Sequence, residues 1–285
     1  MTRGSWLVLT LVLTACRTVV VQEGAIITPI PDRQLTAAAT AAQLPGYAYE
    51  EHRIVATDGT ALHAVLLRHQ DAPLTVLFFG GNQFRISEHG LATAKTLAPM
   101  GTSLMVVDHR GYGRSEGKPT LALLLSDALV VFDSLAALPG IDPGTVVVHG
   151  HSLGSFLAGH VAANRSTGGV VLQSSVTTAE EWTRSLPPWW MRPFVRMRPA
   201  ESLRGQGNLE NVRRLEEPLL VLVGSEDRVT PPGLSRGLYE AATLPPGRKR
   251  LAILEGAGHN DLDRHARFHD VYASFMSLVG DSGGR

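Results

Sequence analysis

The residues best suited to chemistry lie at 150–154, where the chain reads Gly-His-Ser-Leu-Gly. This stretch directly follows the apolar run 145–149 and precedes a helix-compatible run of mostly small residues, 155–163. A serine in so sharp a turn between a strand and a helix is exposed at the carboxyl end of the strand, and flanking glycines remove the Cβ atoms that would clash there. The pattern predicts that Ser152 is a nucleophile whose base lies elsewhere in the chain.

A second Gly-x-Ser-x-Gly match, at 113–117, has different flanks. The apolar run before it, 103–108, ends several residues too early, and a Lys-Pro pair follows before any helical pattern begins. A nucleophile turn needs a strand on one side and a helix on the other. Ser115 is therefore predicted to be a loop serine.

A serine hydroxyl needs a base within hydrogen-bond reach, and the base needs a carboxylate that fixes its tautomer. His259 lies just past the last apolar run, 251–254, and Asp227 lies just past the run 219–223. The carboxyl ends of parallel strands meet at one edge of a sheet, where such folds bind ligands. We therefore expect both side chains to meet Ser152, with Glu226 as the alternative to Asp227.

Five motifs in fixed order carry a specific resemblance. They are Phe-Phe-Gly-Gly-Asn at 78–82, Asp-His-Arg-Gly-Tyr-Gly-Arg-Ser-Glu-Gly at 108–117, the serine turn at 150–154, the stretch 224–231, and Gly-His at 258–259. With these motifs the chain resembles the serine hydrolases of the α/β-hydrolase superfamily, and is most similar to the serine-aminopeptidase-like group. The motifs extend from residue 78 to residue 259, which is most of the predicted domain.

The resemblance implies an oxyanion hole built from two backbone N–H groups. One belongs to Leu153, which follows the nucleophile, and the other is assigned by position to Asn82, with Gln83 as the open alternative. The family usually has His-Gly where this chain has Gly80 and Gly81. Because the donor is backbone, this departure need not abolish activity. The chemistry needs no cofactor and no metal, and no His, Asp or Glu cluster has metal-ligand spacing.

The surrounding pattern predicts an α/β fold of the α/β-hydrolase type over residues 46–281. A leading β-hairpin pairs 51–57 with 60–67 across an Asp-Gly turn. Continuous apolar runs then alternate with helical stretches, which is typical of a mostly parallel, doubly wound sheet. The expected strands are 74–79, 104–107, 146–148, 170–172, 219–223 and 251–254. The expected helices are 88–99, 120–138, 153–164, 233–243 and 263–280.

An insertion at about 176–214 interrupts this rhythm and is predicted to form a small cap over the active site. It holds three of the four tryptophans of the chain, Trp182, Trp189 and Trp190, together with several arginines. Two interpretations stay open: the tryptophans form an apolar acyl pocket with a cationic rim, or they anchor the cap to the domain. His109 and Arg110 follow a strand end, where they could line the pocket. The favoured expectation is that they brace the loop, through Arg110 and Asp108.

The N-terminus is predicted to be a lipoprotein signal peptide over residues 1–15. Arg3 precedes the apolar run 6–13, which is too short to span a bilayer comfortably. The following Leu-Thr-Ala-Cys resembles the bacterial lipobox, in which the cysteine becomes the lipidated first residue. Cys16 is the only cysteine. We expect a lipid anchor there, a tether over 16–45, and a location in the bacterial cell envelope, at the outer membrane if the organism has two membranes.

Composition excludes some classes of function. Basic and acidic residues balance at 26 each, and no basic stripe with interleaved aromatics supports binding of nucleic acid.

The sequence predicts a serine hydrolase that cleaves ester, thioester or amide bonds of a small acyl substrate, with carboxylesterase or lipase-like activity favoured. The alternatives are a peptidase or acyltransferase on the same triad, or a non-catalytic envelope lipoprotein.

Overall fold

The computed structural model of the chain describes residues 17–32, 44–97 and 100–283. Cys16, the predicted signal peptide and residues 33–43 of the predicted tether lie outside this range. Within it, no helix is both long enough and apolar enough to cross a membrane.

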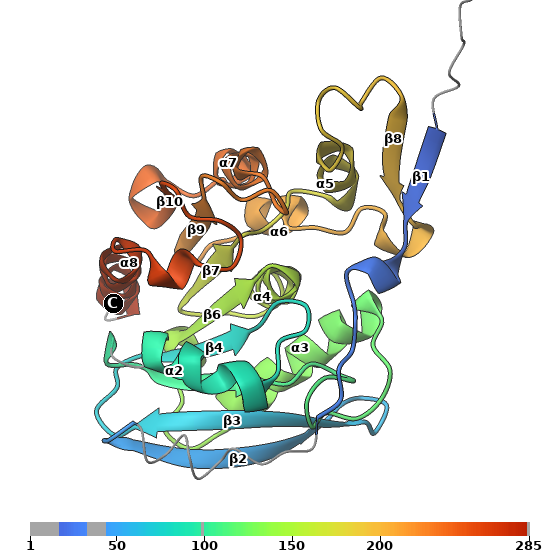
Figure 1. The fold of residues 1–285 in the computed structure, drawn as a ribbon. Coiled ribbons are helices and arrows are strands. Elements are labelled where there is room, and N and C mark those ends of the chain that lie inside the picture. Colours follow the sequence, from blue (N-terminus) through green and yellow to red (C-terminus); the bar gives the residue numbers. More distant parts are fainter. Residues whose placement is uncertain (1–16, 33–43, 98–99, 284–285) are drawn as a thin grey trace, which may run out of the picture.

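The centre of the molecule is an eight-stranded sheet with the order β10-β9-β7-β6-β4-β5-β3-β2 (Figure 1). It opens with the predicted antiparallel hairpin, β2 (Tyr47–Val55) and β3 (Ala61–His69), whose turn contains Gly59 at a φ of +86°. From β5 onward along the sheet every pairing is parallel. The parallel strands are β4 (Thr75–Phe79), β5 (Ser103–Val107), β6 (Val146–His151), β7 (Gly169–Gln173), β9 (Leu219–Gly224) and β10 (Lys249–Leu254).

Helices cover both faces of this sheet, because alternate residues of the apolar strands point to opposite sides. Leu77 and Phe79 belong to a core shared with α3 (Leu121–Ala136), α4 (Leu153–Ala162) and α7 (Pro232–Ala241). The intervening residues Val76 and Phe78 pack in a second core with α2 (Leu91–Leu97) and α8 (Phe268–Gly283).

Two helices begin later than the sequence predicts. A π-helical turn, η2 (Ile86–Gly90), precedes α2, and a 3-10 turn precedes α8. The short 3-10 turns of the described chain are η1 (Glu23–Ala25), η4 (Pro143–Thr145), η5 (Glu201–Leu203), η6 (Pro246–Arg248) and η7 (Leu262–Arg264).

The insertion between β7 and β9 forms a lobe beside the carboxyl edge of the sheet (Figure 1). It contains α5 (Ala179–Ser185), β8 (Val195–Pro199) and α6 (Leu209–Arg213). Strand β8 pairs in parallel with β1 (Arg17–Val21), so the N-terminal segment completes a two-stranded sheet in the cap.

The predicted tether differs from what the structure shows over residues 17–32. After β1 this segment continues along the domain, where Ile27 is buried and Gly113 N–H donates to Ile30 O at 2.9 Å. Asp32 N–H donates in turn to Gly113 O at 2.7 Å. The polar composition that indicated a tether hides a β-branched run at 18–21, for which β8 supplies an exposed edge.

Candidate active site

Ser152 occupies the sharp turn between β6 and α4, with φ 52° and ψ −115°. The turn requires glycine two residues before and two residues after Ser152. A Cβ on Gly150 would lie 2.2 Å from Gly154 O, and a Cβ on Gly154 would lie 2.0 Å from Phe79 O. Ser152 N–H donates to Gln173 O at 2.9 Å, which fastens the turn to β7. Strand, turn and helix therefore hold the hydroxyl in one place, in a backbone conformation that few L-residues adopt.

The structure brings together the three residues predicted for the triad. His259, on the loop after β10, places Nε2 3.0 Å from Ser152 Oγ and Nδ1 2.8 Å from Asp227 Oδ2. Asp227, on the loop after β9, is buried, whereas its rival Glu226 is exposed. This is the serine–base–carboxylate order that activates a hydroxyl.

Several donors fix the Asp227 carboxylate. The amides of Val229 and Thr230 donate to Oδ1 at 2.9 and 2.8 Å, and the Thr230 hydroxyl donates to Oδ2 at 2.8 Å. Burial raises the pKa of Asp227, but the hydrogen bonds from His259 and Thr230 outweigh it, so the pKa lies below its ordinary value. Thr230 was not predicted from the sequence, although a threonine three residues after an aspartate in a loop is a common partner for it.

The predicted oxyanion donors lie beside Ser152. Leu153 is the first residue of α4, so its N–H has no acceptor within the helix. A Cβ on Gly81, the residue before Asn82, would lie only 3.4 Å from Ser152 Cβ. At Gly80 a Cβ would lie 2.1 Å from the Phe84 ring, which explains why the histidine usual in the family is absent here.

The N-terminal segment holds the side chain of Asn82. Thr28 N–H donates to Asn82 Oδ1 at 2.9 Å, and Asn82 Nδ2 donates to Thr28 Oγ1 at 2.5 Å. The Tyr112 hydroxyl also donates to Oδ1, at 2.9 Å. Three hydrogen bonds therefore set the conformation of the loop that carries the predicted donor, just before Gln83 takes a φ of +67°. Thr28 was not predicted as a site residue, because the polar composition around it indicated a tether.

Two histidines next to the nucleophile are structural. His151 Nε2 bonds to His259 O at 3.0 Å, and burial together with the neighbouring His259 lowers the pKa of His151 to about 4. His149 lies between Gln173 Oε1 (3.0 Å) and the Tyr272 hydroxyl (3.1 Å), and burial lowers its pKa to about 3. Both rings are neutral at neutral pH, and His151 helps to position the loop of His259.

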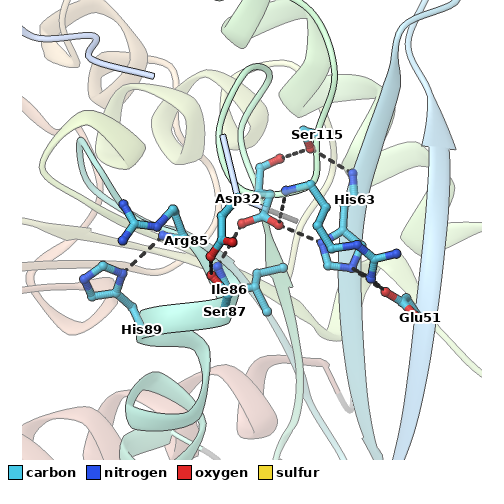
Figure 2. Close-up of polar contacts among 10 residues, drawn as sticks. Asp32, Glu51, His63, Arg85, Ile86, Ser87, His89 and Ser115 are labelled. Atoms are coloured by element: carbon cyan, nitrogen blue, oxygen red, sulfur yellow. Dashed lines mark hydrogen bonds and ion pairs between the residues drawn. The ribbon is translucent and has the colours of Figure 1, made fainter. Parts of the chain in front are cut away.

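Ser115, in the second glycine-flanked match, is buried and fully occupied. Its hydroxyl accepts from His63 N–H at 2.8 Å and donates to Asp108 O at 2.6 Å (Figure 2). The Asp108 carboxylate accepts from Ile86 N–H at 2.8 Å and pairs with His63 Nδ1 at 2.7 Å. The same figure shows Asp32 beside Ser87, a hydrogen bond that fastens the N-terminal segment to η2.

The expected brace between Arg110 and Asp108 is wrong. Arg110 bonds instead to Asp127, at 2.7 and 2.8 Å, and to Asp58, at 2.8 Å. Its side chain thus connects its own loop to α3 and to the β2–β3 turn. Asp108 is already occupied by His63 and by backbone amides.

A cavity of about 860 Å³ opens over Ser152 and His259. The described residues lining it include the apolar Ile26, Phe156 and Trp182. The Trp182 indole N–H donates to Val229 O at 2.8 Å, so this tryptophan both lines the cavity and anchors the cap to the loop of Asp227. No group of three or more His, Cys, Asp or Glu side chains in the described ranges could hold a metal ion.

For Trp189 and Trp190, both interpretations drawn from the sequence are wrong. Their exposed fractions are 79% and 58%, and neither lines the cavity. They lie in the stretch between α5 and β8, which loops out at the far end of the lobe (Figure 1), and more than half of each side chain is exposed.

A mostly parallel sheet covered on both faces, with a serine turn after β6 and an aspartate and a histidine after β9 and β10, defines an α/β-hydrolase fold. An esterase from Pyrococcus furiosus shares it, with a TM-score of 0.64 and 17% identity over 90% of this chain and 97% of the esterase. The predicted fold class is therefore confirmed.

Comparison of sequences extends this result. The family described as "Serine aminopeptidase, S33" matches residues 86–204, which include Ser152. An uncharacterized protein of Mycobacterium tuberculosis is 32% identical over 59% of this chain and 57% of its own length. Human protein ABHD12B is 33% identical over 60% of this chain and 50% of its own length, so the matches span little more than half of these relatives. The chain belongs to the α/β-hydrolase superfamily.

Proposed function

We propose that the chain is a serine hydrolase that cleaves carboxylic esters through an acyl-enzyme formed on Ser152. The observation that carries this proposal is the pair of contacts made by His259, 3.0 Å to Ser152 Oγ and 2.8 Å to Asp227 Oδ2. Thioesters and amides present the same carbonyl chemistry and belong to the same proposed class of substrate.

In the first half of the reaction, Ser152 Oγ attacks the carbonyl carbon and its proton passes to His259 Nε2. The Nδ1–H group of His259 stays bonded to Asp227, which stabilises the charged ring. The N–H groups of Leu153 and Asn82 donate to the carbonyl oxygen as it gains negative charge. The leaving alcohol takes the proton from His259, and the acyl group remains on Ser152.

In the second half, water enters and gives a proton to His259 Nε2 as its oxygen attacks the acyl carbon. Collapse of the second tetrahedral intermediate breaks the bond to Ser152 Oγ, which recovers its proton from His259. The products are a carboxylic acid and the regenerated serine. Ile26, Phe156 and Trp182 give the cavity an apolar portion that can hold an acyl chain. Charged side chains, among them Arg85 and Glu88, line the cavity as well.

A peptidase activity is the second candidate, because the matching family is described as a serine aminopeptidase. Hydrolysis of p-nitrophenyl butyrate against that of aminoacyl p-nitroanilides separates the two candidates. An acyltransferase would give transfer to an added alcohol in preference to water.

We also propose that the chain is a lipoprotein of the bacterial envelope, anchored through Cys16. The support is the apolar run 6–13 followed by Leu-Thr-Ala-Cys, with no other cysteine in the chain. The intact mass of the processed protein tests this, since the proposal requires loss of residues 1–15 and addition of acyl chains.

The test of the catalytic proposal uses a fluorophosphonate probe, which reacts with an activated serine, together with hydrolysis of p-nitrophenyl butyrate. Ser152→Ala should abolish labelling and hydrolysis. Ser115→Ala, the matched control in the second Gly-x-Ser-x-Gly stretch, should retain labelling. An unlabelled wild-type protein would indicate a non-catalytic envelope lipoprotein and would overturn the proposal.

A further inference from the structure

The tip of the cap carries an exposed apolar cluster that the proposed chemistry does not use. Among the described residues, large apolar side chains are exposed at seven positions, and five of these lie on β1 or in the stretch leading into β8. We name these five the cap-tip patch: Val19, Val20, Trp189, Trp190 and Phe194. Phe194 is 52% exposed, and its carbonyl accepts from Arg17 N–H at 2.9 Å, so β1 begins beside it.

The same region is strongly basic. Arginines stand at four exposed positions: Arg17, Arg192, Arg196 and Arg198. Residues 17–21 and 186–199 contain no aspartate or glutamate, whereas the chain as a whole is neutral. None of the four guanidinium groups forms an ion pair with a carboxylate of the described chain. The cap tip therefore combines large apolar side chains with about four uncompensated positive charges.

This combination fits a lipid surface. Tryptophan and phenylalanine insert at the boundary between headgroups and acyl chains, and arginines bind anionic headgroups. The position of the patch in the chain points to the same partner. Arg17 directly follows Cys16, and one residue spans at most about 3.6 Å. A lipid on Cys16 would hold the start of β1, and with it Phe194, at the bilayer surface.

We propose that the cap-tip patch docks on an anionic lipid bilayer. The proposal rests in part on the anchoring proposed at Cys16 and is independent of the chemistry at Ser152. Docking fixes the orientation of the domain relative to the bilayer. Strand β1 leads into η1, and Ala25 of η1 lines the cavity, as does Trp182 of α5. The lobe that touches the bilayer is thus also a wall of the active site.

The experiment uses the full, processed chain on vesicles of phosphatidylcholine, with or without phosphatidylglycerol, prepared with brominated acyl chains. Bromine quenches tryptophan only at short range. Processing removes Trp6 together with residues 1–15, so Trp182→Phe leaves Trp189 and Trp190 as the reporters. We expect quenching on vesicles that contain phosphatidylglycerol, and less on phosphatidylcholine alone.

Two sets of variants sharpen the result. The triple variant Arg192→Gln, Arg196→Gln, Arg198→Gln should shift the docking equilibrium about a hundredfold, because each arginine near an anionic surface contributes a factor of about five. Phe194→Ser should weaken quenching, whereas Val55→Ser should not. Both side chains are 52% exposed, but Val55 lies on β2, at the edge of the main sheet.

Absence of quenching on vesicles that contain phosphatidylglycerol would overturn the proposal. An equal loss of quenching in Val55→Ser and in Phe194→Ser would also overturn it. So would a dimer in sedimentation velocity that depends on Trp189 and Trp190, since the partner of the patch would then be a second copy of the chain. Failure of the proposed anchoring appears separately, in the intact mass of the processed protein. Failure of the proposed catalysis appears separately as well, in fluorophosphonate labelling.

Discussion

Thr28→Val tests whether the N-terminal segment supports catalysis. Valine has nearly the shape of threonine, so Asn82 Nδ2 loses its 2.5 Å acceptor while Thr28 N–H can still donate to Asn82 Oδ1. A donor left unpaired in a half-buried site costs about 1–3 kcal/mol, which corresponds to a factor of about 5 to 150. Loss of a whole oxyanion donor lowers kcat about 100- to 1000-fold. A loop that is loosened but present should therefore lower kcat about tenfold.

The assay is steady-state hydrolysis of p-nitrophenyl butyrate. Because an oxyanion donor acts mainly in the transition state, kcat should fall while KM changes little. Thr28→Ser keeps the hydroxyl and should retain most of the activity. Thr18→Val, on exposed β1 in the same segment, is the matched control and should behave as wild type. A Thr28→Val enzyme with wild-type kcat, or an equal loss in Thr28→Ser, would refute the reasoning.

Two further predictions concern stability. Gly154→Ala would place a Cβ 2.0 Å from Phe79 O, so we expect the free energy of unfolding, measured in urea, to fall by about 3 kcal/mol or more. Gly233→Ala, with open space around it in α7, is the control and should be neutral or stabilising. Equal changes in the two variants would contradict this prediction. His149 has a folded pKa of about 3 and an unfolded value of about 6.5, so the unfolded state binds the extra proton and stability should fall as pH drops from about 6.5 toward 3. His149→Gln should flatten that slope in unfolding measured across the window, and an unchanged slope would exclude His149 as its source.

The placement of Ser152, Asp227 and His259 was predictable because it depends on local signals. Each follows an apolar run of strand length, and parallel strands bring their carboxyl ends to one edge whatever the details of packing. The six parallel strands followed from the same continuous apolar runs. The first residues of α2 and α8 were not predicted correctly, since a π-helical turn precedes α2 and a 3-10 turn precedes α8 where regular helix was expected.

What the sequence did not predict depends on partners distant in the chain. Strand β1 forms because β8, nearly 180 residues later, offers it an edge to pair with. Thr28 holds the side chain of Asn82 although 54 residues separate the two in the chain. Arg110 was paired with the neighbouring Asp108, but its real partners lie 17 and 52 residues away. The exposure of Trp189 and Trp190 was likewise invisible, because tryptophan is normally buried against a core.

Residues 17–32 connect β1, at the start of the described chain, to the cavity over Ser152, so the two are coupled energetically. Ala25 and Ile26 line the cavity, so a bound acyl chain can contact the N-terminal segment only while residues 17–32 are packed against the domain. Coupling between two sites is reciprocal. If packing of residues 17–32 strengthens binding of the ligand by some factor, the bound ligand must therefore stabilise that packing by the same factor. If the chain is anchored through Cys16 as proposed, tension on that end would oppose both. With that proposed anchor, mechanical strain at the N-terminal end would change the affinity of the cavity for its ligand.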